Sequence, residues 1–141
     1  MEETRLSPMR SEILLNGPWD FVPKDSDGTA AETIMVPSSW TAQPHHMIYG
    51  GVTKADLGEA VYRRQVMIPE SWRGRRIVLE LGRVSTEAEV SVNGKPCGRV
   101  EWPYGEVDIT SAVEAGQNAA IEIRVRAIPP EGETWALMGY V

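Results

Sequence analysis

The stretch Tyr62–Gly94, YRRQVMIPESWRGRRIVLELGRVSTEAEVSVNG, contains three strand-like runs separated by turn residues. The runs are Tyr62–Ile68, Arg75–Leu81 and Glu87–Val92. A proline and a glycine lie between the first two, and Asn93-Gly94 closes the third, a dipeptide typical of a type I′ hairpin turn. Short runs punctuated in this way predict neighbouring strands of an antiparallel β-sandwich.

Apolar and polar residues alternate most clearly in two places, Glu87–Val92 and Ala120–Ala127. In the second run Ile121, Ile123 and Val125 share one face, as in a half-buried strand. The sequence predicts about eight short strands with almost no helix, a pattern typical of an all-β jelly-roll β-sandwich. The other expected elements are a strand through Trp19 and Phe21, strands at Thr33–Val36, Cys97–Glu101 and Val107–Thr110, and one helical turn at Ser111–Ala115.

A chain of 141 residues is most simply one domain. We expect a loose N-terminal arm at residues 1–11 and a single sandwich domain at 12–141, with a long surface loop at Ser38–Gly58. The net charge of −6 argues against nucleic acid or an anionic membrane as the main partner. The basic cluster Arg73, Arg75 and Arg76 is local, and we interpret it as a solvated strand end.

The sequence contains no motif for a cofactor or a metal. There is no phosphate-cradling glycine loop and no Cys-x-x-Cys, and Cys97 is the single cysteine, so an internal disulfide is excluded. His45 and His46 are neighbours whose side chains would point to opposite sides of an extended segment, which argues against a shared metal. The run Ile13–Leu15 is too short for a signal-peptide core, so we expect a soluble chain and leave its compartment open.

Candidate residues for chemistry are aromatic rather than catalytic. No nucleophile motif is visible, and no pair of carboxylates stands out as the two that glycoside hydrolysis requires; Glu87 and Glu89 are interpreted as solvated. Three aromatic residues fit core positions, namely Trp19, Trp40 and Tyr62, whereas Trp102, Tyr104 and Trp135 fall in turn-like or terminal segments. A flat ring with a polar edge suits the apolar C–H face of a pyranose. The alternative is that these rings cap the ends of the sandwich.

Several short motifs occur in an order that resembles the N-terminal sugar-binding domain of glycoside hydrolase family 2, the family of β-galactosidases, β-glucuronidases and β-mannosidases. The resemblance runs from about Leu15 onward and is strongest toward β-glucuronidases. The motifs are Asn16–Phe21 (NGPWDF), Val36–Trp40 (VPSSW), Tyr62–Trp72, Gly74–Leu79, Val90–Gly94 (VSVNG), Val107–Thr110 (VDIT) and Gly116–Asn118 (GQN).

The resemblance implies a galactose-binding-like jelly roll that precedes an immunoglobulin-like domain and a (β/α)8 barrel. The barrel carries both catalytic glutamates, so no catalytic residue is assigned here. Glu133, two residues before Trp135, matches a sugar-contacting aspartate of β-galactosidases, whereas the asparagine expected after Ile48-Tyr49 is replaced by glycine. Asn93 is a further sugar-ligand candidate, although Asn-Gly is first a turn signal.

Three functions remain open from the sequence. The chain is a sugar-binding domain cut from a family 2 enzyme, a stand-alone carbohydrate-binding module, or a structural domain whose aromatic residues form an interface. The expected partners are accordingly a carbohydrate and the barrel and immunoglobulin-like domains of a parent enzyme.

Overall fold

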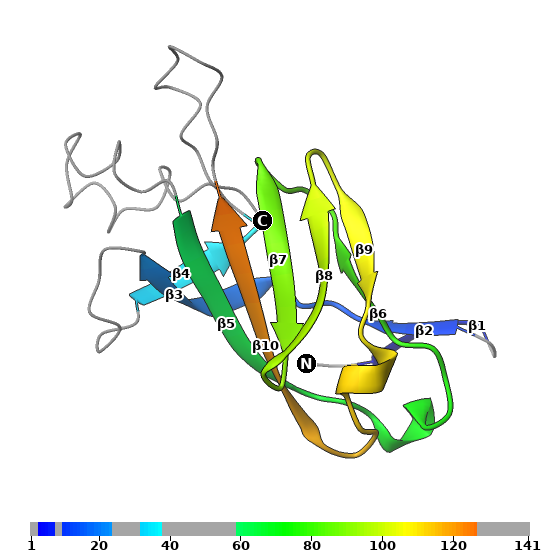
Figure 1. Cartoon of the computed structure of the whole chain (residues 1–141). Coiled ribbons are helices and arrows are strands. Elements are labelled where there is room, and N and C mark those ends of the chain that lie inside the picture. The colour runs from blue at the N-terminus through cyan, green and yellow to red at the C-terminus, as the bar shows by residue number, and fades with distance from the viewer. Residues whose placement is uncertain (1–2, 8–9, 24–31, 38–58, 127–141) are drawn as a thin grey trace, which may run out of the picture.

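The computed structural model describes residues 3–7, 10–23, 32–37 and 59–126 of the chain (Figure 1). Within these ranges the backbone forms ten β-strands and two single turns of 3₁₀ helix. The strands belong to three antiparallel sheets, of which the largest has six strands and the other two have two strands each.

The six-stranded sheet has the order β4-β3-β5-β10-β7-β8. The long strand β10 lies near its centre, paired along its whole length with β5 and along its C-terminal part with β7. The bounds are β3 Gly17–Pro23, β4 Glu32–Val36, β5 Glu59–Met67, β7 Glu87–Val92, β8 Lys95–Glu101 and β10 Asn118–Arg126.

A second sheet pairs β6 (Val78–Leu81) with β9 (Gly105–Asp108). The chain leaves the large sheet after β5 to form β6, returns for β7 and β8, crosses again to β9, and comes back as β10 (Figure 1). The 3₁₀ turns η1 (Glu70–Trp72) and η2 (Thr110–Ala112) lie in the β5–β6 and β9–β10 connections. This repeated crossing between two sheets is the route of a jelly-roll sandwich, so the predicted fold is confirmed.

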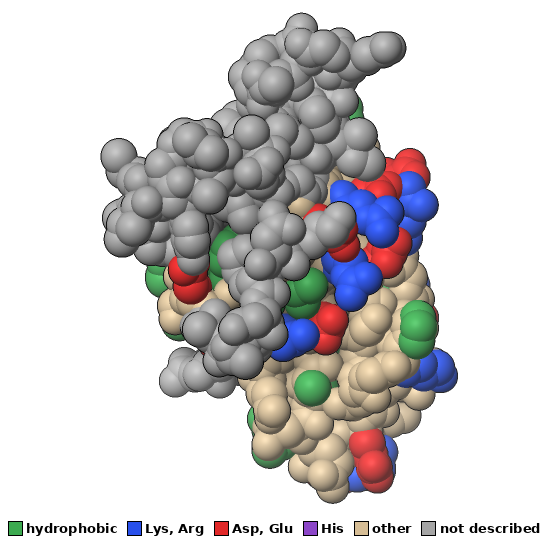
Figure 2. Space-filling model, turned by 60° about the vertical axis from the view of Figure 1, so that its left-hand side comes forward, with side chains coloured by type: hydrophobic (Ala, Val, Ile, Leu, Met, Phe, Trp, Pro, Cys, Tyr) green, Lys and Arg blue, Asp and Glu red, His purple; other side chains and the backbone are tan. Residues whose placement is uncertain are grey.

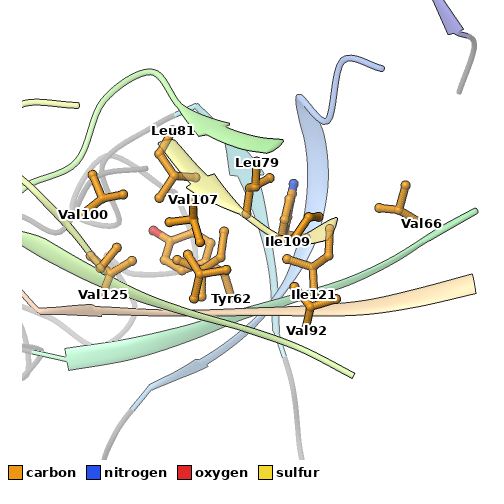
Figure 3. Packing of buried hydrophobic residues seen from close by; sticks show 14 of the residues in the cluster. Tyr62, Val66, Leu79, Leu81, Val92, Val100, Val107, Ile109, Ile121 and Val125 are labelled. Atoms are coloured by element: carbon orange, nitrogen blue, oxygen red, sulfur yellow. The ribbon is translucent and has the colours of Figure 1, made fainter. Parts of the chain in front are cut away.

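The core lies between the two sheets. Figure 3 shows Leu79, Leu81 and Val107 of the small sheet facing Tyr62 and Val125 of the large sheet. In β7 and β10 every second side chain faces this interior, because successive side chains of a strand point to opposite faces. The predicted inward faces of β7 and β10 are therefore confirmed.

Tyr62 is the largest of the fully buried side chains. Its ring meets the ring of Phe21 edge-on, with centroids 5.5 Å apart, a favourable geometry for two aromatic quadrupoles. Trp19 is also buried, as the sequence predicted, and its indole N–H donates a hydrogen bond of 2.8 Å to the Leu15 carbonyl. Trp40, the third aromatic residue assigned to the core, lies outside the described residues.

The turn between β7 and β8 has the predicted chemistry. Asn93 and Gly94 have φ values of 52° and 79°, and a type I′ turn requires positive φ at both central positions. The Asn93 amide also links two neighbouring segments, because Nδ2 donates to the Ala112 carbonyl at 2.8 Å and Oδ1 accepts from the Ala120 N–H at 2.9 Å.

The N-terminal region contains secondary structure that the sequence did not indicate. Strand β1 (Glu3–Ser7) pairs with β2 (Arg10–Ile13) in a two-stranded sheet of its own. This hairpin crosses the boundary drawn after residue 11, where a loose arm was expected. The division of the chain into an arm and a domain at that point stays a prediction.

Candidate functional site

Strands β8 and β9 approach each other closely where they leave the two sheets. A Cβ atom placed on Gly98 would lie 3.0 Å from Cγ1 of Val107, and one placed on Gly105 would lie 3.0 Å from Cγ1 of Val100. Glycine at these two positions therefore lets the strands pack against each other's valines. We call the segment Arg99–Glu106, which turns from one sheet to the other, the β8–β9 corner.

The connection at the tip of the β8–β9 corner is held by backbone hydrogen bonds. The Trp102 N–H donates to the Thr86 carbonyl at 2.7 Å, and the Val84 N–H donates to the Pro103 carbonyl at 2.8 Å. The two rings of this connection nevertheless remain in solvent, with Trp102 62% and Tyr104 70% exposed. Large aromatic side chains that are exposed on an anchored loop are unusual and indicate a contact surface.

Beside Tyr104 the surface forms a shallow, open depression. It combines an aromatic ring with carboxylate oxygens, which accept hydrogen bonds from hydroxyl groups, and with a guanidinium group. These are the chemical groups that bind polyols. The lining residues are Arg99, Val100, Glu101, Tyr104, Gly105 and Glu106.

Glu87 lies on the outer face of the large sheet and contacts Arg99, which lines the depression. Its carboxylate is hydrogen-bonded to Arg99 and lies 3.4 Å from Nη1 of Arg126. Arg99 also contacts Glu101, with Nη2 and Oε1 2.9 Å apart. The chain of charges continues on β10 and β5, where Glu59 lies 3.9 Å from Arg126 and 3.5 Å from Arg124.

We call these six residues the ion-pair network. They come from four adjacent strands, and on the face shown in Figure 2 acidic and basic side chains lie side by side. The strand register explains the arrangement, because Glu87 is directly opposite Arg126 on β10, a pair of opposite charges that stabilises the sheet. Glu87 is also opposite Glu101 on β8, and Arg99 contacts both of these carboxylates.

Glu87 differs from the sequence-based interpretation. It was expected to be solvated like Glu89, but only 7% of the residue is exposed, whereas Glu89 is exposed as expected. The two arginines that flank Glu87 explain how a carboxylate can be buried there, since buried charges require partners. The expectation was therefore correct for Glu89 and wrong for Glu87.

Of the five predicted sugar-contacting residues, Trp102 and Tyr104 both lie on the β8–β9 corner, and of these two only Tyr104 lines the depression. Asn93 lies at the other end of β8, in the β7–β8 turn (Figure 1), and its amide already has the two intramolecular partners described above. Glu133 and Trp135 lie outside the described residues, as do His45 and His46. The sugar-binding roles of all five residues stay predictions.

The sequence analysis missed three polar residues of the site, namely Arg99, Glu101 and Glu106. The available signal was their position, because they flank the Trp-Pro-Tyr segment and alternate with Val100 and Val107, which are buried. Within the described ranges, no group of three or more potential metal-ligating side chains is placed to hold an ion. No helix in the same ranges is long and apolar enough to cross a membrane.

No protein-family model matches the chain. Among curated proteins it is similar to a β-glucuronidase from Bacteroides fragilis, with 27% identity over 121 residues, 84% of this chain and 17% of the relative. It is also similar to a β-galactosidase from Thermoanaerobacter pseudethanolicus, with 28% identity over 141 residues, 87% of this chain and 18% of the relative. Among solved structures, a β-glucuronidase from Ruminococcus gnavus matches with a TM-score of 0.72 and 21% identity, covering 93% of this chain and 25% of that one.

The chain thus spans less than a fifth of the length of these curated relatives. It aligns with one domain of family 2 glycoside hydrolases, in agreement with the order of its sequence motifs. The structural matches show that the fold is shared with that domain.

Proposed function

We propose that the chain is a sugar-binding accessory domain of a family 2 glycoside hydrolase and that hydrolysis is performed by other domains of the parent enzyme. The similarity to single domains of β-glucuronidases and a β-galactosidase supports this proposal. On this reading the partners of the domain are a carbohydrate and the barrel and immunoglobulin-like domains of the parent.

The observation that carries the sugar-binding part is the pair of exposed rings on the anchored tip of the β8–β9 corner. A pyranose presents an apolar face to an aromatic ring and hydroxyl groups to its surroundings. Tyr104 supplies the ring in the depression, and Glu101 and Glu106 supply acceptors for the hydroxyls. Because the loop backbone is fixed by hydrogen bonds, little conformational entropy is lost when a sugar binds there.

The proposal is tested by titrating the isotopically labelled chain with methyl β-glucoside, methyl β-galactoside and methyl β-glucuronide, monitored by NMR. We expect saturable shifts of the amides of Arg99–Glu106 and loss of binding in Trp102→Ala and Tyr104→Ala. Leu14→Ala is the matched control, because Leu14 is a similarly exposed apolar residue at 65%. Absence of any saturable shift would contradict the sugar-binding role.

The accessory role has its own test. Purified chain incubated with nitrophenyl β-glucuronide and β-galactoside is expected to release no nitrophenol. The natural gene is expected to encode a barrel with two catalytic glutamates in the same reading frame. Turnover that is lost in a single Glu→Gln variant of the chain would overturn the accessory role.

A structural role is the second candidate, and the β1–β2 hairpin favours it. An isolated two-stranded hairpin is marginally stable in water, so a two-stranded sheet separate from the sandwich is suited to packing against another surface. Concentration-dependent self-association in sedimentation experiments, without any response to sugar, would favour this role over sugar binding.

A further inference from the structure

Negatively charged side chains outnumber positively charged ones among the described residues that line the depression. Among the described residues that line it, Arg99 is the one cation, and two carboxylates, Glu101 and Glu106, accompany it. Nη2 of the Arg99 guanidinium already donates hydrogen bonds to both Glu87 and Glu101. A ligand that approaches the depression therefore meets acceptor oxygens in excess and a cation whose positive charge is already compensated.

The charged residues next to the depression do not offset the excess of carboxylates in its lining. Arg126 is shared between Glu87 and Glu59. On the side of β9, Arg76 lies 3.8 Å from Glu106 but donates a hydrogen bond to Asp108 at 3.1 Å. The ion-pair network contains three arginines and three glutamates and is formally neutral. Arg76 faces two carboxylates, those of Glu106 and Asp108, so these described residues carry a formal excess of one negative charge.

An ionised carboxylate has only acceptor sites. Glu101 and Glu106 can therefore bind hydroxyl groups, which donate, but they repel a ligand carboxylate. A uronate that approaches Arg99 would lie beside Glu101 and Glu87, whose charges already compensate the guanidinium. Like charges repel, so a uronate carboxylate binds there less favourably than a neutral hydroxymethyl group.

We propose that the β8–β9 corner binds neutral pyranosides and discriminates against uronic acids. This inference rests on the proposed sugar-binding function and adds the substrate class of that site. The specificity proposed for this surface therefore differs from the specificity for glucuronides that the names of the β-glucuronidase relatives state.

Methyl β-glucoside and methyl β-glucuronide form a matched pair of probes, because they differ only at C6. We expect the glucuronide to bind the full 141-residue chain about fivefold more weakly, the factor that corresponds to one charge repulsion at about 4 Å in water. Added salt should reduce this difference, since exposed charges are screened. The measurement is an NMR titration that follows the amides of Arg99–Glu106.

Glu101→Gln removes one of the two carboxylates that hold Arg99. We expect the preference for the glucoside to fall toward unity in this variant, because one carboxylate that repels the uronate and compensates the Arg99 charge is removed. Glu122→Gln is the matched control: Glu122 is also ion-paired, with Arg63 at 3.5 Å, but lies on the outer face of β10 away from the corner. The control is expected to keep the full preference.

The outcomes are distinguishable. Equal or tighter binding of the glucuronide by the unmodified chain would overturn the discrimination and leave the sugar-binding function standing. Saturable binding of neither probe would overturn both. Retention of the preference in Glu101→Gln, with shifts still centred on Arg99–Glu106, would overturn the role assigned to the Glu101–Arg99 pair.

Discussion

Glu87 is a carboxylate buried on the outer face of a sheet by two arginines, Arg99 and Arg126. Replacing it by glutamine leaves both guanidinium groups without their shared anion. Because the arginines are about half exposed, water compensates part of the loss. We expect Glu87→Gln to lower the free energy of unfolding by about 1–2 kcal/mol, within the range for hydrogen bonds to charged groups.

Urea denaturation measures this effect, and Glu89→Gln is the control on the same strand and the same face. Glu89 is exposed, so its replacement should change stability by less than about 0.5 kcal/mol. Equal effects in the two variants would show that the ion-pair network does not stabilise the fold.

Tyr62 carries a hydroxyl group into the interior. No described residue lies within hydrogen-bond distance of it, and burial raises the pKa of the phenol. A buried hydroxyl without a partner destabilises the folded state, so Tyr62→Phe should leave the free energy of unfolding unchanged or raise it by about 1 kcal/mol. Thermal denaturation tests this, and a clear loss of stability would show that the hydroxyl is satisfied in the folded protein.

Asp108 confers a dependence of stability on pH. Hydrogen bonds from the hydroxyl and the N–H of Thr110, and then from Arg76, lower the pKa of Asp108 to about 2. A carboxyl group whose pKa is lower in the folded state stabilises that state above its unfolded pKa and loses this contribution as the pH falls through the folded pKa. The contribution is therefore complete at neutral pH and disappears as the pH falls from about 4 toward 2.

We expect Asp108→Asn to melt at a lower temperature than the unmodified chain at pH 7. The two melting temperatures should converge only as the pH falls below about 2, because Asp108 then becomes protonated in the folded state as well as in the unfolded state. A difference in melting temperature that is constant between pH 7 and pH 2 would contradict this assignment.

At the level of elements, the contact between β8 and β9 depends on glycine. The φ of Gly98 is not positive, so alanine can adopt the same backbone conformation. The added Cβ, however, would press on the buried side chain of Val107. Overpacking of this kind typically costs 1–3 kcal/mol, and the reduced entropy of the unfolded chain offsets part of that cost. We expect Gly98→Ala to destabilise the domain by about 1 kcal/mol.

Gly82→Ala is the matched control. Nothing lies within 4 Å of a Cβ at Gly82, and its φ is not positive, so this substitution should be neutral or slightly stabilising. Chemical denaturation of the two variants in parallel separates the close strand contact from the general effect of replacing glycine. If Gly98→Ala is as stable as Gly82→Ala, Val107 can move to admit the added methyl group without lowering the free energy of unfolding.

The strands that the sequence predicted well share a physical property: one face is buried and the other is exposed, so the pattern of β7 and β10 shows in the residues themselves. The β1–β2 hairpin lacks such a pattern and is defined by backbone pairing. The ion-pair network could not be predicted either, because Glu59, Glu87 and Arg126 are far apart in the chain and meet only through strand register. Trp102 and Tyr104 were found as candidates because aromatic residues in turns stand out by type alone.

At the level of the whole molecule, the sandwich and the N-terminal hairpin are separate sheets. The buried hydrophobic cluster is drawn from residues between Trp19 and Val125, with Leu15 packed against it. Leu15 also accepts hydrogen bonds from the side chains of Trp19 and Arg64 through its carbonyl, at 2.8 and 2.7 Å. Among the described residues, those that pack into the sandwich therefore begin at Leu15.

Deleting residues 1–13 should accordingly leave the sandwich folded. We expect unchanged near-ultraviolet circular dichroism and a loss of less than about 1 kcal/mol in the free energy of unfolding, because the core side chains found in the described part of the chain are all kept. A second truncation that also removes Leu14 and Leu15 should be clearly less stable, since the Trp19 indole and the Arg64 guanidinium lose their shared acceptor. If the shorter deletion already unfolds the domain, the β1–β2 hairpin is part of the cooperative unit, and it could not then act as a separate docking element for another domain.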